Sequence, residues 1–425
     1  MRVLINSYAC CPNMGSEPGM GWHWIVSLAQ SCDCYVISEG EFRPKVEQWM
    51  TQSENKLLAE HIHFYWLPIG GDDDKRNERI RRMCWNQGDW RFYHYYRQWQ
   101  KRAAECAREI VDAQRKAGAP IQILHQLNMI GFREPGYLWL VSKEKNVPFV
   151  WGPIGGMKMF PVAYASDWKH KCFNVLKNTI TALQLLYSTR VRKSIAQASA
   201  LVASIPDSHE TIRHYYKRDS IIIPETGCDI SYPQNDRISN DKFTILWVGK
   251  FDYRKRLDIA ISAIAVANNN HLQLVVYGSG SQRQINEAKS QVARLNLDNQ
   301  VIFAGVCANS EIKQKMSRAD AFLFTSVSED TSTVVLEAVS EQLPVVCFDC
   351  CGMSTVIDEH VGIKIPLTSP KQSINDFAKA LNTLYASREL CSQLSHNCIQ
   401  RAQELSWDNK GRQMRNIYQS VIINH

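Results

Sequence analysis

The sequence has no uninterrupted apolar segment near the roughly 20 residues that a transmembrane helix needs, so the 425-residue chain is expected to be soluble or peripheral to a membrane. It also lacks a signal-peptide core, because the apolar stretch Val3–Ile5 is too short. Its 14 cysteines include no pair of Cys-x-x-Cys units at zinc spacing, which excludes the common structural zinc sites. Scattered cysteines of this kind are expected to be reduced and mostly buried, which favours a cytoplasmic location.

Two further absences narrow the function. No Gly-x-Gly-x-x-Gly follows an expected strand, which argues against a nicotinamide dehydrogenase. The chain also has no tandem repeat and no low-complexity tract. Its content of 45% hydrophobic and 21% charged residues is that of an ordinary globular protein, and its length suggests two or three domains.

Short apolar runs alternate with amphipathic helical stretches along the whole chain. Most of the runs are apolar throughout, as expected for strands buried on both faces of a parallel sheet. The expected strands are Val3–Tyr8, Tyr35–Ser38, Ile62–Leu67, Ile121–His125, Pro148–Trp151, Leu201–Ser204, Ile221–Ile223, Thr244–Val248, Leu272–Tyr277, Val301–Ala304, Ala321–Thr325, Pro344–Phe348 and Gly362–Ile365. The alternation predicts an α/β fold of two Rossmann-like parallel-sheet domains.

A polar segment near the middle of the chain predicts the domain boundary. Residues 229–242 contain one proline and two Asn-Asp pairs and show no periodicity, as expected of a linker. We therefore expect a first domain over residues 1–230 and a second over 231–406. Apolar residues at helical spacing after Trp407 predict a terminal helix that needs a surface to pack on.

Ligands of doubly wound sheets bind at the carboxyl ends of the strands, so the residues after each strand of the second domain are candidates. After the strand Thr244–Val248, Gly249 opens a turn with four cations, among them Lys250 and Lys255, that could hold a diphosphate. A solvated basic loop is the alternative. After the strand Leu272–Tyr277, the Gly278-Ser-Gly280 turn would let the backbone approach a ligand closely.

The sharpest motif follows the strand Ala321–Thr325. Glu329 and Glu337 lie eight positions apart and flank the helix-capping run of Thr331, Ser332 and Thr333. The free N–H groups and the dipole of a helix that starts there favour a phosphate. Glu337 would then reach a ribose diol and Glu329 the donor sugar. Two surface carboxylates beside a helix cap are the simpler alternative.

The order of these motifs resembles the retaining glycosyltransferases of family 4, which have the GT-B fold. Carrying the resemblance are Gly249-Lys250, Lys255, Gly278-x-Gly280, Glu329-x7-Glu337 and Glu341-x2-Pro344, together with the loop Pro12–Trp22 and the segment Ile222–Asp229. The resemblance implies two Rossmann-like domains facing each other across a cleft, with a C-terminal helix, residues 407–425, packing back on the first domain. It also implies transfer of a hexose-type sugar from a nucleotide-sugar to a glycan or lipid-linked acceptor, as in bacterial cell-surface polysaccharide synthesis.

The resemblance assigns roles to individual residues. Lys250 and Lys255 would neutralise the donor diphosphate, and Gly15 and Ser16 would line the cleft. No cofactor and no metal is required, since the nucleotide-sugar is itself a substrate. The family often has a histidine after the fifth strand, where this chain reads Trp151-Gly152-Pro153. His125 could replace it on the acceptor side, although a lone histidine is more often structural.

A basic and aromatic segment, residues 75–102, offers a candidate acceptor surface. It has a net charge of +7 and seven interleaved aromatic residues. Arg81, Arg82, Trp85 and Trp90 would face an anionic membrane or stack on a sugar. The alternative is a helix whose aromatics are core and whose cations are solvated.

Two other functions fit part of the sequence. A GT-B sugar-nucleotide epimerase would bind the same donor without an acceptor. A nucleic-acid-binding protein could use residues 75–102, but no RNA-binding signature accompanies that segment, so a nucleic-acid partner is not expected. The sequence therefore favours a glycosyltransferase that is either free in the cytoplasm or peripheral at the inner face of a membrane.

Overall fold

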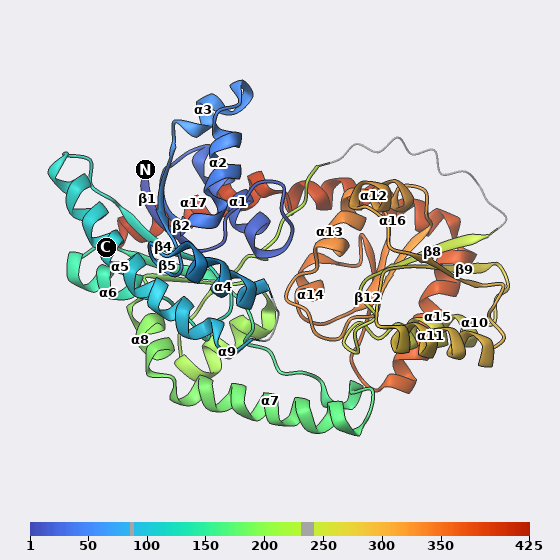
Figure 1. Cartoon of the computed structure of the whole chain (residues 1–425). Helices are drawn as coiled ribbons and strands as arrows, with labels where there is room; N and C mark the ends of the chain where they lie inside the picture. The colour runs from blue at the N-terminus through green and yellow to red at the C-terminus, as the bar shows by residue number, and fades with distance from the viewer. Residues whose placement is uncertain (86–88, 231–241) are drawn as a thin grey trace. The chain divides into compact units, whose positions relative to one another are not determined.

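A computed structural model describes residues 1–85, 89–230 and 242–425, which divide into two compact units (Figure 1). Unit 1 comprises Met1–Lys158, Ala182–Glu225 and Trp407–His425, and unit 2 comprises Met159–Thr181 and Thr226–Ser406. Segment 159–181, which the sequence analysis placed in the first domain, thus belongs to unit 2. The expected linker falls largely on residues 231–241, outside the described residues.

Unit 1 is built on a seven-stranded parallel sheet in the order β3-β2-β1-β4-β5-β6-β7. Its strands are β1 (Arg2–Ser7), β2 (Asp33–Glu39), β3 (Ile62–Leu67), β4 (Ile123–Asn128), β5 (Phe149–Ile154), β6 (Ala200–Ala203) and β7 (Ile221–Ile222). Its helices are α1 (Ser16–Ala29), α2 (Arg43–Met50), α3 (Lys56–Ala59), α4 (Asp74–Trp85), α5 (Phe92–Lys116), α6 (Leu138–Lys145), α8 (Thr189–Gln197), α9 (Pro206–Tyr216) and α17 (Trp407–Ile423), with 3-10 turns at Gly40–Phe42 and Ser53–Asn55.

Unit 2 has a six-stranded parallel sheet in the order β10-β9-β8-β11-β12-β13. Its strands are β8 (Phe243–Val248), β9 (Leu272–Tyr277), β10 (Val301–Gly305), β11 (Ala321–Phe324), β12 (Val345–Phe348) and β13 (Gly362–Ile365). Its helices are α10 (Leu257–Ala267), α11 (Gln282–Arg294), α12 (Asn309–Met316), α13 (Thr333–Ser340), α14 (Met353–Val356), α15 (Pro370–Ala386) and α16 (Arg388–Glu404), with a 3-10 turn at Val162–Tyr164. The helix α7 (Trp168–Tyr187) begins in unit 2 and ends in unit 1.

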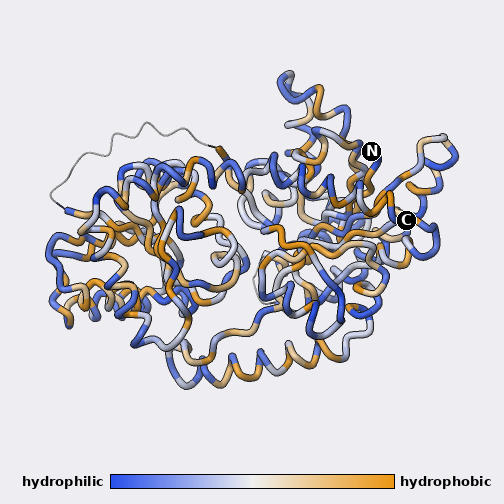
Figure 2. Tube along the Cα trace, turned by 180° about the vertical axis from the view of Figure 1, so that it is seen from behind, coloured by the Kyte–Doolittle hydropathy of each residue, from blue (hydrophilic) through white to orange (hydrophobic). Residues whose placement is uncertain are grey.

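Every strand expected from the sequence is present, and both sheets are wholly parallel, so the predicted fold class is confirmed. The strands are mostly orange in Figure 2, whereas the helices alternate between orange and blue. Strands in the middle of each sheet, such as β4 and β11, have no exposed side chain because helices cover both faces.

The C-terminal helix α17 completes the core of unit 1. Its apolar side buries Met414 and Tyr418 in the cluster that also contains Trp24 of α1. Trp407 stacks on His23 at 4.9 Å between ring centroids, and the buried Lys410 ammonium donates to the carbonyl of Pro224 at 2.9 Å. The helix that ends the chain therefore packs on the unit that begins it.

Candidate functional site

The carboxyl edge of the second sheet is tied together by backbone hydrogen bonds beyond the strands themselves. The Gly249 amide donates to the Tyr277 carbonyl at 3.0 Å, and the Gly278 amide donates to the Gly305 carbonyl at 2.7 Å. Gly278 has φ +149°, and a Cβ there would lie 1.8 Å from the Gly249 carbonyl oxygen. Only glycine permits this approach, which fixes the loops after β8 and β9 side by side.

Lys255 and Glu329, 74 positions apart in the sequence, form an ion pair at this edge. The Lys255 Nζ lies 2.9 Å from Glu329 Oε1, and the two side chains are 15% and 21% exposed. The ammonium also lies 4.8 Å from the centre of the Phe324 ring, and Ser326 Oγ donates to Glu329 Oε1 at 3.1 Å. The structure thus brings together two of the three predicted catalytic residues. The third, Lys250, directly follows Gly249 after β8 and is exposed.

The predicted capping run lies where α13 begins. Ser332 is the N-cap of the helix but makes no side-chain capping hydrogen bond, and Thr333 is its exposed first residue. The loop after β12 packs on the preceding loop, because the Gly352 amide donates to the Asp330 carbonyl at 2.9 Å. A Cβ on Gly352 would lie 2.4 Å from Thr331 Oγ1. The start of α13 is therefore held by close packing on one side.

Glu337 lies on α13 and is half-buried. Its Oε1 accepts a hydrogen bond of 3.0 Å from Asn309 Nδ2, at the start of α12. Asn309 was missed by the sequence analysis, which considered strand ends and not neighbouring helices. Gly280 was predicted to allow a close backbone approach, and a Cβ placed on it would lie 2.7 Å from Phe251 Cβ of the loop after β8.

Gly15 and Ser16 lie in unit 1, at the start of α1. Gly15 is the N-cap of α1, and Ser16 has a positive φ of 58°. Both are exposed, and nothing lies within 4 Å of a Cβ placed on Gly15. The loop therefore presents its backbone to solvent at the carboxyl end of β1.

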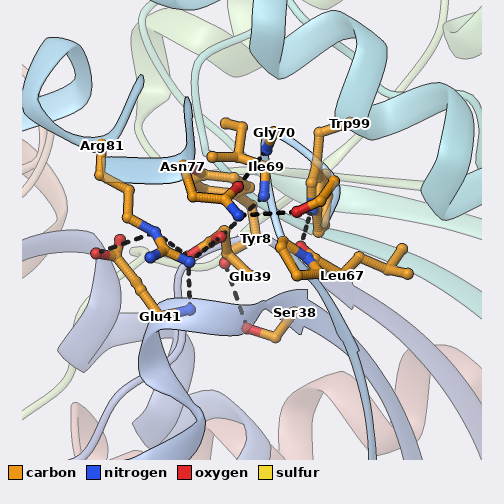
Figure 3. Close-up of polar contacts among 12 residues, drawn as sticks. Tyr8, Ser38, Glu39, Glu41, Leu67, Ile69, Gly70, Asn77, Arg81 and Trp99 are labelled. Atoms are coloured by element: carbon orange, nitrogen blue, oxygen red, sulfur yellow. Dashed lines mark hydrogen bonds and ion pairs between the residues drawn. The ribbon is translucent and has the colours of Figure 1, made fainter. Parts of the chain in front are cut away.

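A charged cluster at the carboxyl ends of β2 and β3 was not predicted (Figure 3). The side chain of Glu39 is fully buried and accepts from the amides of Ile69 at 2.9 Å and Glu41 at 2.7 Å. Arg81 of α4 donates to both Glu39 oxygens, at 2.9 and 3.3 Å. Burial, followed by the charge of Glu39, raises the pKa of Glu41 to about 7. Arg81 was predicted to contact the acceptor, but its guanidinium is mainly engaged with Glu39 of the same unit.

The basic and aromatic segment, residues 75–102, contains both buried and exposed aromatic side chains. Phe92, Tyr96 and Trp99 of α5 are buried core residues, as the alternative interpretation expected. Trp85 and Trp90, in contrast, are 58% and 78% exposed. Arg82 is also exposed, and it forms an ion pair with Glu78 on the same helix. Residues 86–88 of this segment lie outside the described residues.

His125 is a buried residue of β4 with both ring nitrogens in hydrogen bonds. Its Nε2 lies 2.7 Å from the Gly152 carbonyl, which can only accept, so Nδ1 accepts from the Tyr418 hydroxyl at 2.6 Å. Burial lowers its pKa to about 4. This geometry ties α17 to β4 and leaves neither ring nitrogen for an acceptor, so we assign His125 a structural role.

Among the helices of the described chain, none is long and apolar enough to cross a bilayer.

Comparison with known proteins finds a family match within the second half of the chain. Residues 230–404 match the model of the glycosyl transferases group 1 family. The chain is 25% identical over 196 residues to an uncharacterized glycosyltransferase of Methanocaldococcus jannaschii, and 25% identical over 191 residues to alpha-monoglucosyldiacylglycerol synthase of Streptococcus pneumoniae. These matches cover 45% and 44% of this chain, and the chain spans only 49% and 41% of the two relatives.

The whole chain resembles a solved structure. HepE of Anabaena, crystallised with UDP, superimposes with a TM-score of 0.64 at 16% sequence identity, over 99% of this chain and 100% of that one. A likeness at this identity shows the fold alone. It supports the predicted GT-B class of two parallel-sheet α/β domains.

Proposed function

We infer that this chain, whose residues 230–404 match the glycosyl transferases group 1 family, is a retaining glycosyltransferase. We propose that it moves a hexose-type sugar from a nucleotide-sugar to a glycan or lipid-linked acceptor. The observation that carries the proposal is the Lys255–Glu329 pair, part-buried at the carboxyl edge of the second sheet where doubly wound folds bind ligands.

The proposed chemistry is mainly electrostatic. Transfer breaks the bond between the anomeric carbon and a diphosphate oxygen, so negative charge grows on the departing diphosphate. Lys255, Lys250 and the free N–H groups at the start of α13 would stabilise that charge. Glu329 would contact the donor sugar and Glu337 the ribose. With cations of the protein in this role, the proposed reaction requires no metal and no cofactor.

A UDP-hexose is the first donor to test. HepE of Anabaena, which shares the fold, has been solved both with UDP and with UDP-glucose. The acceptor is assigned to unit 1, near the exposed Trp85 and Trp90. We place the reaction at the cytoplasmic face of a membrane, in cell-surface polysaccharide synthesis. The name of the Streptococcus pneumoniae relative, a glucosyldiacylglycerol synthase, supports a lipid-linked acceptor.

A thermal-shift screen against UDP-, GDP- and ADP-hexoses tests the donor. A ligand present at 100 times its Kd stabilises the folded protein by about 2.7 kcal/mol, which raises the melting temperature measurably. The activity is then tested by release of nucleoside diphosphate with and without candidate acceptors. Release that depends on acceptor supports a transferase, whereas conversion of the donor sugar without acceptor would indicate an epimerase. No shift with any nucleotide-sugar would refute the proposal.

A further inference from the structure

The helix α7 turns an apolar side toward solvent. Large apolar side chains in its 20 residues are 41–73% exposed, which is unusual for one element of a folded domain. They are Trp168, Phe173, Val175, Leu176, Ile180, Leu183, Leu186 and Tyr187. In Figure 1 the helix is the long green one labelled α7.

These residues form a strip along the helix. With 3.6 residues per turn, Phe173, Leu176, Ile180, Leu183 and Tyr187 succeed one another at intervals of three and four and therefore share one face. We call this face the outer strip. A row of this length would need to be buried if α7 were an ordinary surface helix.

The opposite face of α7 attaches to the protein through polar groups. The Asn178 side chain accepts from the Phe160 amide and donates to the Phe160 carbonyl, both at 2.9 Å. Asn174 is fully buried and donates to the His170 carbonyl at 2.8 Å, while the Tyr253 hydroxyl donates to its Oδ1 at 3.4 Å. The helix is thus held on its inward face by these contacts and does not use the outer strip to pack.

The charged side chains of α7 itself have one sign, while Asp167, just before the helix, pairs with His170. From Trp168 to Pro206 the chain has six lysines and arginines and no acidic residue. Lys169, Lys171 and Lys177 lie on α7 itself. Trp168 and Tyr187, the amphipathic aromatic residues that favour membrane interfaces, stand at its two ends. An apolar strip with cations and terminal aromatics is complementary to a surface that is apolar inside and negatively charged outside.

We propose that α7 is an interfacial helix that lies on an anionic lipid bilayer, with the outer strip in the acyl region and its lysines among the headgroups. The inference names the element of contact, and it does not depend on the donor assigned to unit 2. A helix in the interface would hold the enzyme at the surface where a lipid-linked acceptor resides.

Vesicle co-sedimentation tests the outer strip. The full chain is expected to bind vesicles of phosphatidylglycerol and phosphatidylcholine, and the triple variant Leu176→Ser, Ile180→Ser, Leu183→Ser is expected to bind about ten-fold or more weakly. An unchanged circular dichroism spectrum and melting temperature show that this variant is folded. Equal binding by the variant, or no binding of the full chain to vesicles, overturns the proposal. So does a dimer that the variant converts to a monomer without any vesicle binding, since a second copy then covers the strip.

A matched control removes exposed apolar side chains elsewhere. Leu57, Val266 and Val306 are 81%, 51% and 76% exposed on other elements. The variant Leu57→Ser, Val266→Ser, Val306→Ser is expected to bind vesicles like the unaltered protein. An equal loss in this control would show that α7 has no special role.

A second comparison tests the charges. Lys169→Gln with Lys171→Gln is expected to weaken binding to phosphatidylglycerol vesicles about five-fold per lysine. Lys289→Gln with Lys371→Gln, on α11 and α15, is the control and is expected to bind normally. Equal effects of the two pairs would contradict a lipid contact at α7.

Cys172 provides a direct probe. It lies on α7 and is the exposed one among the cysteines of the described residues. An environment-sensitive fluorophore on Cys172 is expected to shift its emission to shorter wavelength when phosphatidylglycerol vesicles are added. Bound protein whose label keeps its aqueous emission would place another surface on the membrane.

Discussion

Two ion pairs of equal length, one in each unit, lie near the carboxyl ends of strands. Arg81–Glu39 in unit 1 and Lys255–Glu329 in unit 2 each span 2.9 Å near the carboxyl end of a parallel strand. Glu39 is fully buried and saturated by two amides and a guanidinium, whereas Glu329 is 21% exposed and the Lys255 ammonium 15%. The first pair therefore holds a fold together, and the second keeps its charges within reach of a ligand. Position near a strand end does not distinguish the two pairs, and neither does the exposure of the cation, since Arg81 is 24% exposed. The burial of the carboxylate does distinguish them.

The largest expected difference between the two ion pairs comes from removing Lys255. Lys255→Ala is expected to lower kcat about 10²–10³-fold, because one stabilising cation is lost from the transition state. The fold should persist, since Glu329 remains in contact with water. Nucleoside diphosphate release measures the first effect and circular dichroism the second. Lys289→Ala, at an exposed lysine of α11, is the control, and unchanged turnover in Lys255→Ala would reject the catalytic assignment.

The pair in unit 1 is expected to respond in stability and not in chemistry. Arg81→Ala leaves the buried Glu39 carboxylate without its cation and should lower the free energy of unfolding by about 2–3 kcal/mol. Arg82→Ala removes the neighbouring exposed pair with Glu78 and should cost less than about 0.5 kcal/mol. Urea denaturation compares the two. Equal losses would show that burial does not separate these pairs.

Glu337 provides a second test of the candidate site in unit 2. Glu337→Gln keeps the shape of the side chain and removes its charge, so affinity for the nucleotide is expected to fall about ten-fold through weaker hydrogen bonds to the ribose. Titration calorimetry with UDP measures the change. Glu287→Gln on α11 serves as the control, and an affinity equal to that of the unaltered protein would remove Glu337 from the site.

The smallest expected effect is on the pH dependence of the free energy of unfolding. Two titrating groups of unit 1 change it in opposite directions. The pKa of Glu41 is raised from 4.5 to about 7, so the folded state binds more protons and acidification through that window stabilises it. The pKa of His125 is lowered from 6.5 to about 4, so there the unfolded state binds more protons and acidification destabilises the fold. Between pH 6.5 and 4.5 the two slopes oppose each other.

The variant Glu41→Gln separates these contributions. Without the Glu41 titration, the free energy of unfolding should fall on acidification from pH 6.5 to 5.5 by roughly 1 kcal/mol more than in the unaltered protein. Urea midpoints at several pH values measure the slope. Parallel pH profiles of the two proteins would contradict the assigned pKa of Glu41.

Much of the fold was predictable from the sequence, because strands buried on both faces must be apolar throughout. The runs Ile62–Leu67, Leu272–Tyr277 and Gly362–Ile365 were predicted with the bounds that the structure has. The ends of other strands shifted by one to three residues, since hydrogen bonding and not hydropathy sets them. Half of β4, for example, follows His125, and polar residues such as Gln126 and Asn128 continue the strand.

The candidate site was predictable only in part. Glu329, Glu337 and Lys255 belong to motifs in the linear sequence, but the contact between Lys255 and Glu329 depends on how two loops fold. Glu39 was missed because a single acid after an apolar run has no motif, although the strand-end rule applied to unit 2 would have found it. The exposure of the outer strip of α7 could not be predicted, since periodicity reveals an apolar face of a helix but not which surface that face contacts.

The return of α17 to unit 1 bears on how the protein is made. The sheet of unit 1 is complete by Ile222, yet Tyr418, which hydrogen-bonds His125, is synthesised only after Ser406, the last residue of unit 2. The ribosome therefore finishes the strands and helices of unit 2 while unit 1 still lacks α17, a helix of its hydrophobic core. The order of synthesis and the order of completion are reversed: the half that is translated first is the half that matures last.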